Sequence, residues 1–181
     1  MVATPQRLQS AETHSALCPL LNEIMKAANG GMPFIAIAMA VALPDICASL
    51  ASEDGRTSPD KYKKWCADNL GDLTFVTADD LYSMRCGVLH NGRFGDLKHN
   101  VARVIFALPP VNGQASVFVD CHMRDAYFYS VVEFCKKITT TVHSWMNTNK
   151  DDANIRRNLP NLMQYRENGF PPYIVGATVL A

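Results

Sequence analysis

The residues best suited to chemistry in this sequence lie between positions 77 and 95, in the segment TADDLYSMRCGVLHNGRFG. Four residues separate Arg85 from His90 there. Arginine remains charged and its planar fork suits a phosphate group, whereas histidine can change its charge near neutral pH. A cation that stabilises an anionic transition state, next to a group that moves protons, suits metal-free phosphodiester cleavage. We therefore take Arg85 and His90 as candidate catalytic residues.

Four nearby residues are candidates for binding RNA or a nucleotide. Tyr82 precedes Arg85 by three positions and shares its helical face, so a base could stack on its ring. Asn91 closes the motif, and Arg93 and Lys98 belong to a basic run that follows it. Such a run contacts a phosphate backbone if the fold brings it next to the motif. The ordinary alternatives are that the tyrosine packs in the core and that the basic run is a solvated face.

The pair itself has ordinary interpretations as well. Arg85 could form an ion pair with Asp79 or Asp80, and His90 could bond to the last carbonyl groups of its helix. Cys86 and His90 are four positions apart, so both could point toward one metal ion. A metal site needs further ligands, and no motif supplies them. We therefore expect no metal and no cofactor.

A helix must carry these residues, and its ends are well marked. Thr77 is a predicted N-cap followed by acidic residues, and Asn91-Gly92 is a predicted stop. Five residues of an α-helix turn about 500°, which leaves the side chains of Arg85 and His90 roughly 140° apart. We therefore expect two copies of this helix, facing each other in a homodimer, to gather the groups into one cleft.

The remaining pattern predicts a mainly α-helical single domain over residues 1–181. Apolar periodicity and capping signals predict five further helices. Pro44-Asp45 interrupts the most apolar run, residues 34–43, but the apolar residues continue beyond it, and the helix over residues 34–51 is the expected centre of the bundle. Residues 1–10 are an expected flexible lead-in, residues 101–119 an inserted β-hairpin, and residues 150–181 a C-terminal extension ending in an extended strap. The predicted helices cover residues 10–29, 34–51, 58–70, 125–149 and 151–167, the last of them broken near Pro160.

Composition limits the possible functions. Seventeen basic and seventeen acidic residues balance in a chain of 181, so nucleic acid would have to be bound by a local patch. Six widely spaced cysteines without a CxxC pair indicate reduced, mostly buried thiols. The first ten residues lack the apolar core of a signal peptide, and the apolar run 34–43 is too short to cross a bilayer. We expect a cytoplasmic protein without a membrane role.

Taken with the helix that carries it, the motif LYSMRCGVLHNG resembles the Arg-x4-His signature of the HEPN superfamily. The phrase MAVALPDICASL before it is similar to a branch of bacterial HEPN-like proteins, and the similarity spans roughly residues 20–150. The resemblance implies a four- to five-helix bundle and a homodimer with both motifs in the interface cleft. It also implies metal-independent RNA cleavage by Arg85 and His90, with the ribose 2′-OH as nucleophile.

Many members of the superfamily belong to toxin–antitoxin and defence systems, which implies a possible antitoxin-like partner protein. This sequence has Cys86 where active members often have Asn, Asp or His, and Gly92 where some have Tyr. Inactive HEPN-like domains act as binding or dimerising modules. The alternative function is therefore a non-catalytic module that binds a nucleotide, RNA or a partner protein.

Overall fold

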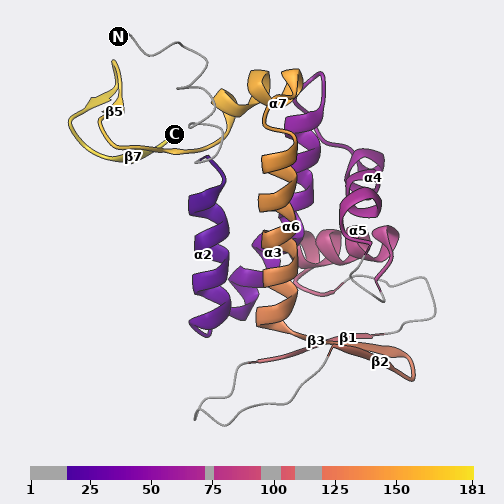
Figure 1. Cartoon of the computed structure of the whole chain (residues 1–181). Helices are drawn as coiled ribbons and strands as arrows, with labels where there is room; N and C mark the ends of the chain where they lie inside the picture. Colours follow the sequence, from indigo (N-terminus) through magenta and orange to yellow (C-terminus); the bar gives the residue numbers. More distant parts are fainter. Residues whose placement is uncertain (1–15, 72–75, 95–102, 109–119) are drawn as a thin grey trace.

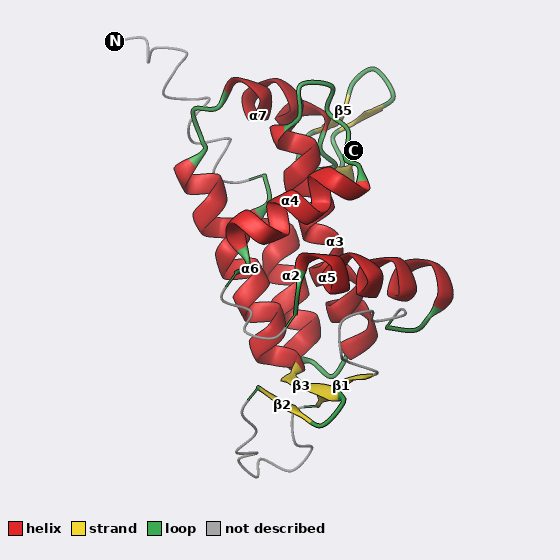
Figure 2. Cartoon of the chain, turned by 90° about the vertical axis from the view of Figure 1, so that its right-hand side faces the viewer, coloured by secondary structure: helices red, strands yellow, loops and turns green. Residues whose placement is uncertain are grey.

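A computed structural model of the chain describes residues 16–71, 76–94, 103–108 and 120–181. This part is mainly helical with small sheets, as expected, and the helices form a bundle with one sheet at its end (Figures 1 and 2). The α-helices are α2 (Cys18–Asn29), α3 (Pro33–Ala51), α4 (Pro59–Asn69), α5 (Ala78–Cys86), α6 (Val131–Thr148) and α7 (Ala153–Asn158). A π-helical turn, η1 (Gly87–Asn91), continues α5, and a short 3-10 turn, η2 (Leu159–Asn161), follows α7.

Helix α3 is the centre of the bundle and packs against α2, α4 and α6. It is one continuous helix with Pro44 inside it, which agrees with the predicted range 34–51. The proline removes a backbone N–H, but it is buried among neighbouring helices whose packing maintains the helix. The buried Tyr62 of α4 contributes by donating its hydroxyl hydrogen to the carbonyl oxygen of Val41, at 2.9 Å. By length and composition α3 could cross a membrane, but half of its apolar window is buried inside the protein.

The end of α2 and the start of α4 agree with the capping signals. Helix α2 ends at Asn29 with Gly30 as its C-cap, as predicted, but it begins at Cys18, so residues 16–17 of the predicted helix are not helical. The predicted start at residue 10 lies outside the described residues. Helix α4 begins at Pro59, and the Ser58 side chain accepts a hydrogen bond from the backbone of its first turn. These two ends depend on local residue types, which explains the agreement.

The sheet at the end of the bundle differs from the predicted hairpin. Its strands are β1 (Arg103–Ala107), β2 (Cys121–Met123) and β3 (Ala126–Ser130), in the order β1-β3-β2. Strand β1 pairs with β3 in parallel, and β2 pairs with β3 antiparallel. The strand near residue 103 is therefore confirmed, but its partner is β3, and residues 109–119 of the predicted hairpin lie outside the described part.

Strand β3 also replaces the predicted beginning of the long helix. We expected a helix from Asp125, whereas α6 begins at Val131 with Ser130 as its N-cap. Residues 127–129 are three aromatic side chains, which favour a strand, and Tyr127 and Tyr129 are buried in it. The helical periodicity identifies the rest of α6 correctly.

After α7 the chain leaves the bundle as a segment of short strands, here called the C-terminal arm (residues 163–181). The short helix predicted within residues 151–167 breaks near Pro160 as expected, because α7 stops at Asn158, and no α-helix follows it up to residue 167. Two two-stranded ribbons follow, in place of the single extended strap that the sequence predicts. They pair β4 (Tyr165–Arg166) with β7 (Val179–Leu180), and β5 (Gly169–Phe170) with β6 (Ile174–Val175).

The six cysteines are free thiols. Cys47, Cys66 and Cys135 are buried, and the other three are partly exposed. Burial raises the pKa of Cys66 and of Cys135 to about 12. These buried thiols are therefore protonated at neutral pH and serve as small apolar core residues.

Candidate functional site

The motif helix begins as its sequence predicts. Thr77 caps α5: its hydroxyl oxygen accepts the backbone N–H of Asp80 at 3.1 Å, and its hydroxyl donates to the Asp80 carboxylate at 2.9 Å. Asp80 is buried in this cap. Lys63 of α4 lies 2.6 Å from the carboxylate of Asp79, the other acidic residue of the first turn. The motif arginine instead forms its ion pair with an aspartate of α3.

The second half of the motif is wider than an α-helix. The backbone N–H of Gly92 bonds to the carbonyl oxygen of Gly87, five residues earlier, and the N–H of Arg93 reaches the same oxygen at 3.1 Å. Gly92 has φ +63°, a left-handed conformation that confirms the predicted stop. A π-helical turn of this kind is rare and is frequent at functional sites.

The wide turn brings the guanidinium and the imidazole together within one chain. Arg85 Nη1 lies 3.1 Å from His90 Nε2. Our expectation that the two side chains diverge by about 140° is therefore wrong, because it assumed an α-helix throughout. An arginine N–H can only donate, so Nε2 accepts this hydrogen bond and carries no proton in this arrangement. The contact assembles the pair without a second copy of the chain.

A residue distant in sequence orients the arginine. Asp45 of α3 accepts a hydrogen bond from Arg85 Nε, with 2.6 Å between nitrogen and oxygen. Both side chains are partly buried, at 15% and 21% exposure. The other carboxylate oxygen of Asp45 accepts from the Thr57 hydroxyl at 3.2 Å. Burial lowers the pKa of Arg85, and the hydrogen bond and charge of Asp45 outweigh that effect, so the pKa is raised above its usual value.

Asp45 is the residue of the candidate site that our sequence interpretation missed. It is the only charged residue in the nineteen residues of α3, within a run of apolar and small side chains. A carboxylate in such a position is costly to bury unless it has a cationic partner. That cost is the signal in the sequence, although it does not identify Arg85 as the partner.

Tyr82 lies on the same helix but packs against its neighbours. Its ring meets that of Tyr62 edge-on, with 5.4 Å between the centroids, and Lys63 Nζ lies 5.3 Å from its centre. Burial and a hydrogen bond with Cys86 raise the pKa of Tyr82. Tyr82 therefore packs against its neighbours, as in the ordinary alternative given above, and its ring is still partly exposed.

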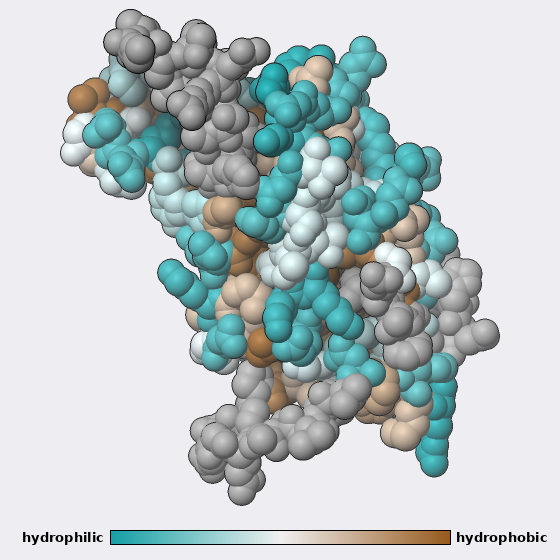
Figure 3. All heavy atoms as spheres, viewed as in Figure 1, coloured by the Kyte–Doolittle hydropathy of each residue, from teal (hydrophilic) through white to brown (hydrophobic). Residues whose placement is uncertain are grey.

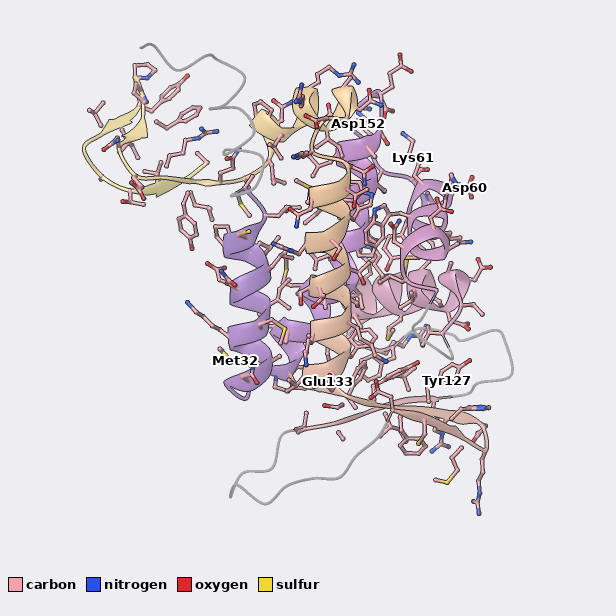
Figure 4. The ribbon with its side chains drawn as sticks, viewed as in Figure 1. Met32, Asp60, Lys61, Tyr127, Glu133 and Asp152 are labelled. Atoms are coloured by element: carbon pink, nitrogen blue, oxygen red, sulfur yellow. The ribbon has the colours of Figure 1, made fainter. Side chains whose placement is uncertain are left out.

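The remaining candidate binding residues lie beyond the pair. Asn91 is exposed at the end of η1. Arg93 is exposed too and lines an apolar groove of about 680 Å³ together with Val88 and Gly92 of the motif. Lys98 lies outside the described residues. Phe34 and Ile35 of α3 and residues of strand β1 also line that groove. Figure 4 shows neighbouring Met32 at the sheet end of the bundle, opposite Asp152.

A second groove of about 320 Å³ lies on the α3 side of the site. It is lined by Asp45 and Thr57 among others, so the carboxylate that holds Arg85 faces this groove. Within the described residues, no cluster of three or more His, Cys, Asp or Glu side chains is arranged to hold a metal ion. The groups that the candidate site presents are the guanidinium of Arg85, the imidazole of His90 and the carboxylate of Asp45, at a partly exposed surface.

The chain was compared with protein-family models, curated proteins and solved structures, and none of them matches it. The resemblance to the HEPN superfamily stays a prediction from the motif and its surroundings.

Proposed function

We propose that this protein is a metal-independent endoribonuclease of the HEPN type, with Arg85 and His90 as its catalytic residues. The observation that supports it most is the 3.1 Å contact between Arg85 Nη1 and His90 Nε2, on a guanidinium that Asp45 holds from the other side. The two groups lie close enough to act on adjacent atoms of one substrate. The proposal includes a homodimer in the cytoplasm and a possible antitoxin-like partner.

The chemistry follows from the roles of the two groups. An RNA phosphodiester replaces the internal contact, so that His90 Nε2 meets the ribose 2′-OH and Arg85 meets the phosphate oxygens. His90 takes the 2′-OH proton while the O2′–P bond forms and the P–O5′ bond breaks. Arg85 stabilises the charge that builds up on the phosphate oxygens. The imidazolium returns its proton to the O5′ leaving group, which gives a 2′,3′-cyclic phosphate and a 5′-hydroxyl end.

Incubation of the purified protein with structured RNA and excess chelator tests this proposal. We expect cleavage in the chelator, with cyclic phosphate ends detectable by mass spectrometry. His90→Ala should reduce the rate by about 10²–10⁴-fold, as loss of a general base does, and Arg85→Ala by about 10²–10³-fold. Lys64→Ala, which removes an exposed cation paired with Asp68, serves as the matched control. No cleavage by the wild type, or equal cleavage by all variants, refutes the proposal.

One observation favours the alternative of a non-catalytic binding module. The guanidinium and the imidazole already bond to each other and to Asp45, so their polar groups are engaged before any substrate arrives. A module of this kind would bind a nucleotide, RNA or a partner protein without turnover. Excess absorbance at 260 nm in the purified protein, together with weaker RNA binding by Arg85→Ala and no cleavage, distinguishes it from the enzyme.

A further inference from the structure

The groove of about 320 Å³ on the α3 side of the candidate site, here called the α3 groove, begins next to the Arg85–His90 pair. Arg85 bonds to His90 through Nη1 and to Asp45 through Nε, and Asp45 lines the groove. Asn158, the last residue of α7, and Asn161 of η2 line it as well. Figure 3 shows that hydrophilic residues gather at the end of the bundle where α7 lies. A groove of this volume can hold a small ligand.

Asn158 presents a hydrogen-bond acceptor at this groove. Its Nδ2 donates to two backbone carbonyl oxygens at the end of α3, at 3.0 Å for Leu50 and 2.7 Å for Ser52. Both amide hydrogens are therefore used, and the amide is held in one orientation. Oδ1 lies on the side of Gly55, 3.0 Å from the position that a Cβ would take there, and no donor among the described residues bonds to it.

Asp45 adds further acceptor capacity without adding net charge. It is the only charged residue that lines the α3 groove, and Arg85 already pairs with it. A carboxylate has about four lone-pair sites, and the bonds from Arg85 and Thr57 occupy two of them. The groove can therefore accept hydrogen bonds, but its paired charge does not favour an ammonium group or a metal ion. An uncharged group with several N–H donors fits these conditions.

The rest of the lining suits a flat, partly apolar ligand. Ile46, Leu50 and Leu162 supply apolar contacts. Asn161 is exposed, and its side-chain amide forms no hydrogen bond with the described residues. An asparagine amide can donate as well as accept, so Asn161 can meet a carbonyl oxygen on the ligand.

Among the RNA bases, guanine has the edge that matches this lining. Its Watson–Crick edge carries two adjacent donor groups, N1–H and the 2-amino group, beside one acceptor, O6. Adenine and cytosine have a single amino donor beside an acceptor nitrogen, and uracil has a single N–H between two carbonyl oxygens. Proteins that bind single-stranded RNA distinguish bases by hydrogen bonds to these edges. The acceptors of the α3 groove therefore favour guanine and oppose uracil.

We propose that the α3 groove binds a guanine base of the RNA, in the nucleotide that flanks the phosphate held by Arg85. Asp45 and Asn158 accept hydrogen bonds from its two donor groups, and the Asn161 amide donates to O6. The inference rests on the proposed ribonuclease function and adds the base that the enzyme selects. Asn161 is then a specificity-determining residue.

Titration calorimetry of the full chain with nucleoside 3′,5′-bisphosphates tests base selection. These probes carry a phosphate on both sides of the ribose and contain no phosphodiester that the proposed reaction could cleave. We expect the guanosine probe to bind at least about tenfold more tightly than the inosine probe, which lacks only the 2-amino group. The adenosine and uridine probes should bind no more tightly than the inosine probe.

Asn161→Leu tests whether the base lies in this groove. Inosine and guanosine both have O6, so this variant should weaken the binding of both probes by the same factor, roughly fivefold. The matched control is Asn168→Leu, which replaces an exposed asparagine of the C-terminal arm that does not line the groove. With RNA of random sequence, the wild type should cleave next to guanine, and Asn161→Leu should cleave next to the other bases more often than the wild type does.

Equal binding of the guanosine and inosine probes overturns the proposal, and so does tighter binding of the adenosine or uridine probe. Unchanged binding by Asn161→Leu overturns it too, as does a wild type that binds a lysine-containing peptide and none of the four probes. The two proposals fail separately. Cleavage without a preference for guanine next to the cut refutes only the base groove, and guanosine-selective binding without cleavage refutes only the ribonuclease.

Discussion

Replacement of Asp45 by alanine tests the geometry of the candidate site most directly. The substitution removes the acceptor of the 2.6 Å hydrogen bond from Arg85 Nε and leaves a guanidinium that is only 21% exposed. That charge must then remain without its partner or move out toward water. Movement takes the guanidinium away from His90, and a guanidinium that stays loses the acceptor that orients it.

The expected loss of stability lies between two known cases. Removal of one partner from a fully buried ion pair costs about 3–5 kcal/mol, whereas an exposed pair contributes about 0–1 kcal/mol. Arg85 and Asp45 are partly exposed, so solvent screening reduces the larger figure, and we expect about 2 kcal/mol. For a chain of this length, that loss lowers Tm by about 4–8 °C. Asp45→Asn keeps an acceptor oxygen and should cost about half as much.

Thermal unfolding under reducing conditions, followed by circular dichroism, measures the effect. A double-mutant cycle with Arg85→Ala isolates the interaction between the two residues. The matched control is the exposed pair of Lys64 and Asp68 on α4, which are 2.8 Å apart and four positions apart in one helix. We expect the control pair to interact by about 0.5 kcal/mol or less.

The reasoning is refuted if Asp45→Ala lowers Tm no further than Asp68→Ala does. It is refuted equally if the effects of Asp45→Ala and Arg85→Ala simply add, because an ion pair must give a coupling energy. If the coupling energy is as expected but Asp45→Ala cleaves RNA at the normal rate, the ion pair exists and does not position the catalytic arginine.

Two further predictions concern the end of the motif and the buried thiols. Gly92→Ala should lower stability by about 1 kcal/mol, because φ is +63° there and no neighbouring atom lies within 4 Å of the added Cβ, so the cost is conformational. Gly92→Asn should cost less, because asparagine tolerates the left-handed conformation. Gly71→Ala is the control, and equal Tm values for all three variants contradict the prediction. The free energy of unfolding should fall as pH rises above about 9, because Cys66 and Cys135 keep their protons up to a pKa of about 12 in the folded protein but lose them near 9.0 once unfolded. Each thiol then contributes a slope of up to about −1.4 kcal/mol per pH unit, which urea unfolding at several pH values measures, and a flat profile above about pH 9 refutes the assignment.

Features that depend on neighbouring residues could be predicted from the sequence. The N-caps at Ser58 and Thr77 and the left-handed stop at Gly92 each need only a few adjacent residues to be recognised. The periodicity of residues 131–148 is equally local, and it identifies the body of α6. Capping and periodicity were therefore sufficient for most of the helical part.

Features that depend on residues far apart in the chain could not be predicted. Strand β1 pairs with β3 more than twenty residues later, and its parallel register appears in no local pattern. Arg85 bonds to Asp45, forty positions earlier, which helix packing alone brings close. The π-helical turn was missed for a related reason, since its backbone bonds were assumed to follow the α-helical register of the first half of the motif.

The width of η1 determines which spacing of the two motif residues places them together. A turn that holds one extra residue allows partners five positions apart to meet, where a regular α-helix requires three or four. A version of this chain that lacked one residue of the turn and wound as a plain helix would present the same guanidinium beside the same imidazole. In distant relatives we therefore expect either four or three residues between the Arg and the His. The aspartate on the apolar helix α3 is the third residue of the pattern.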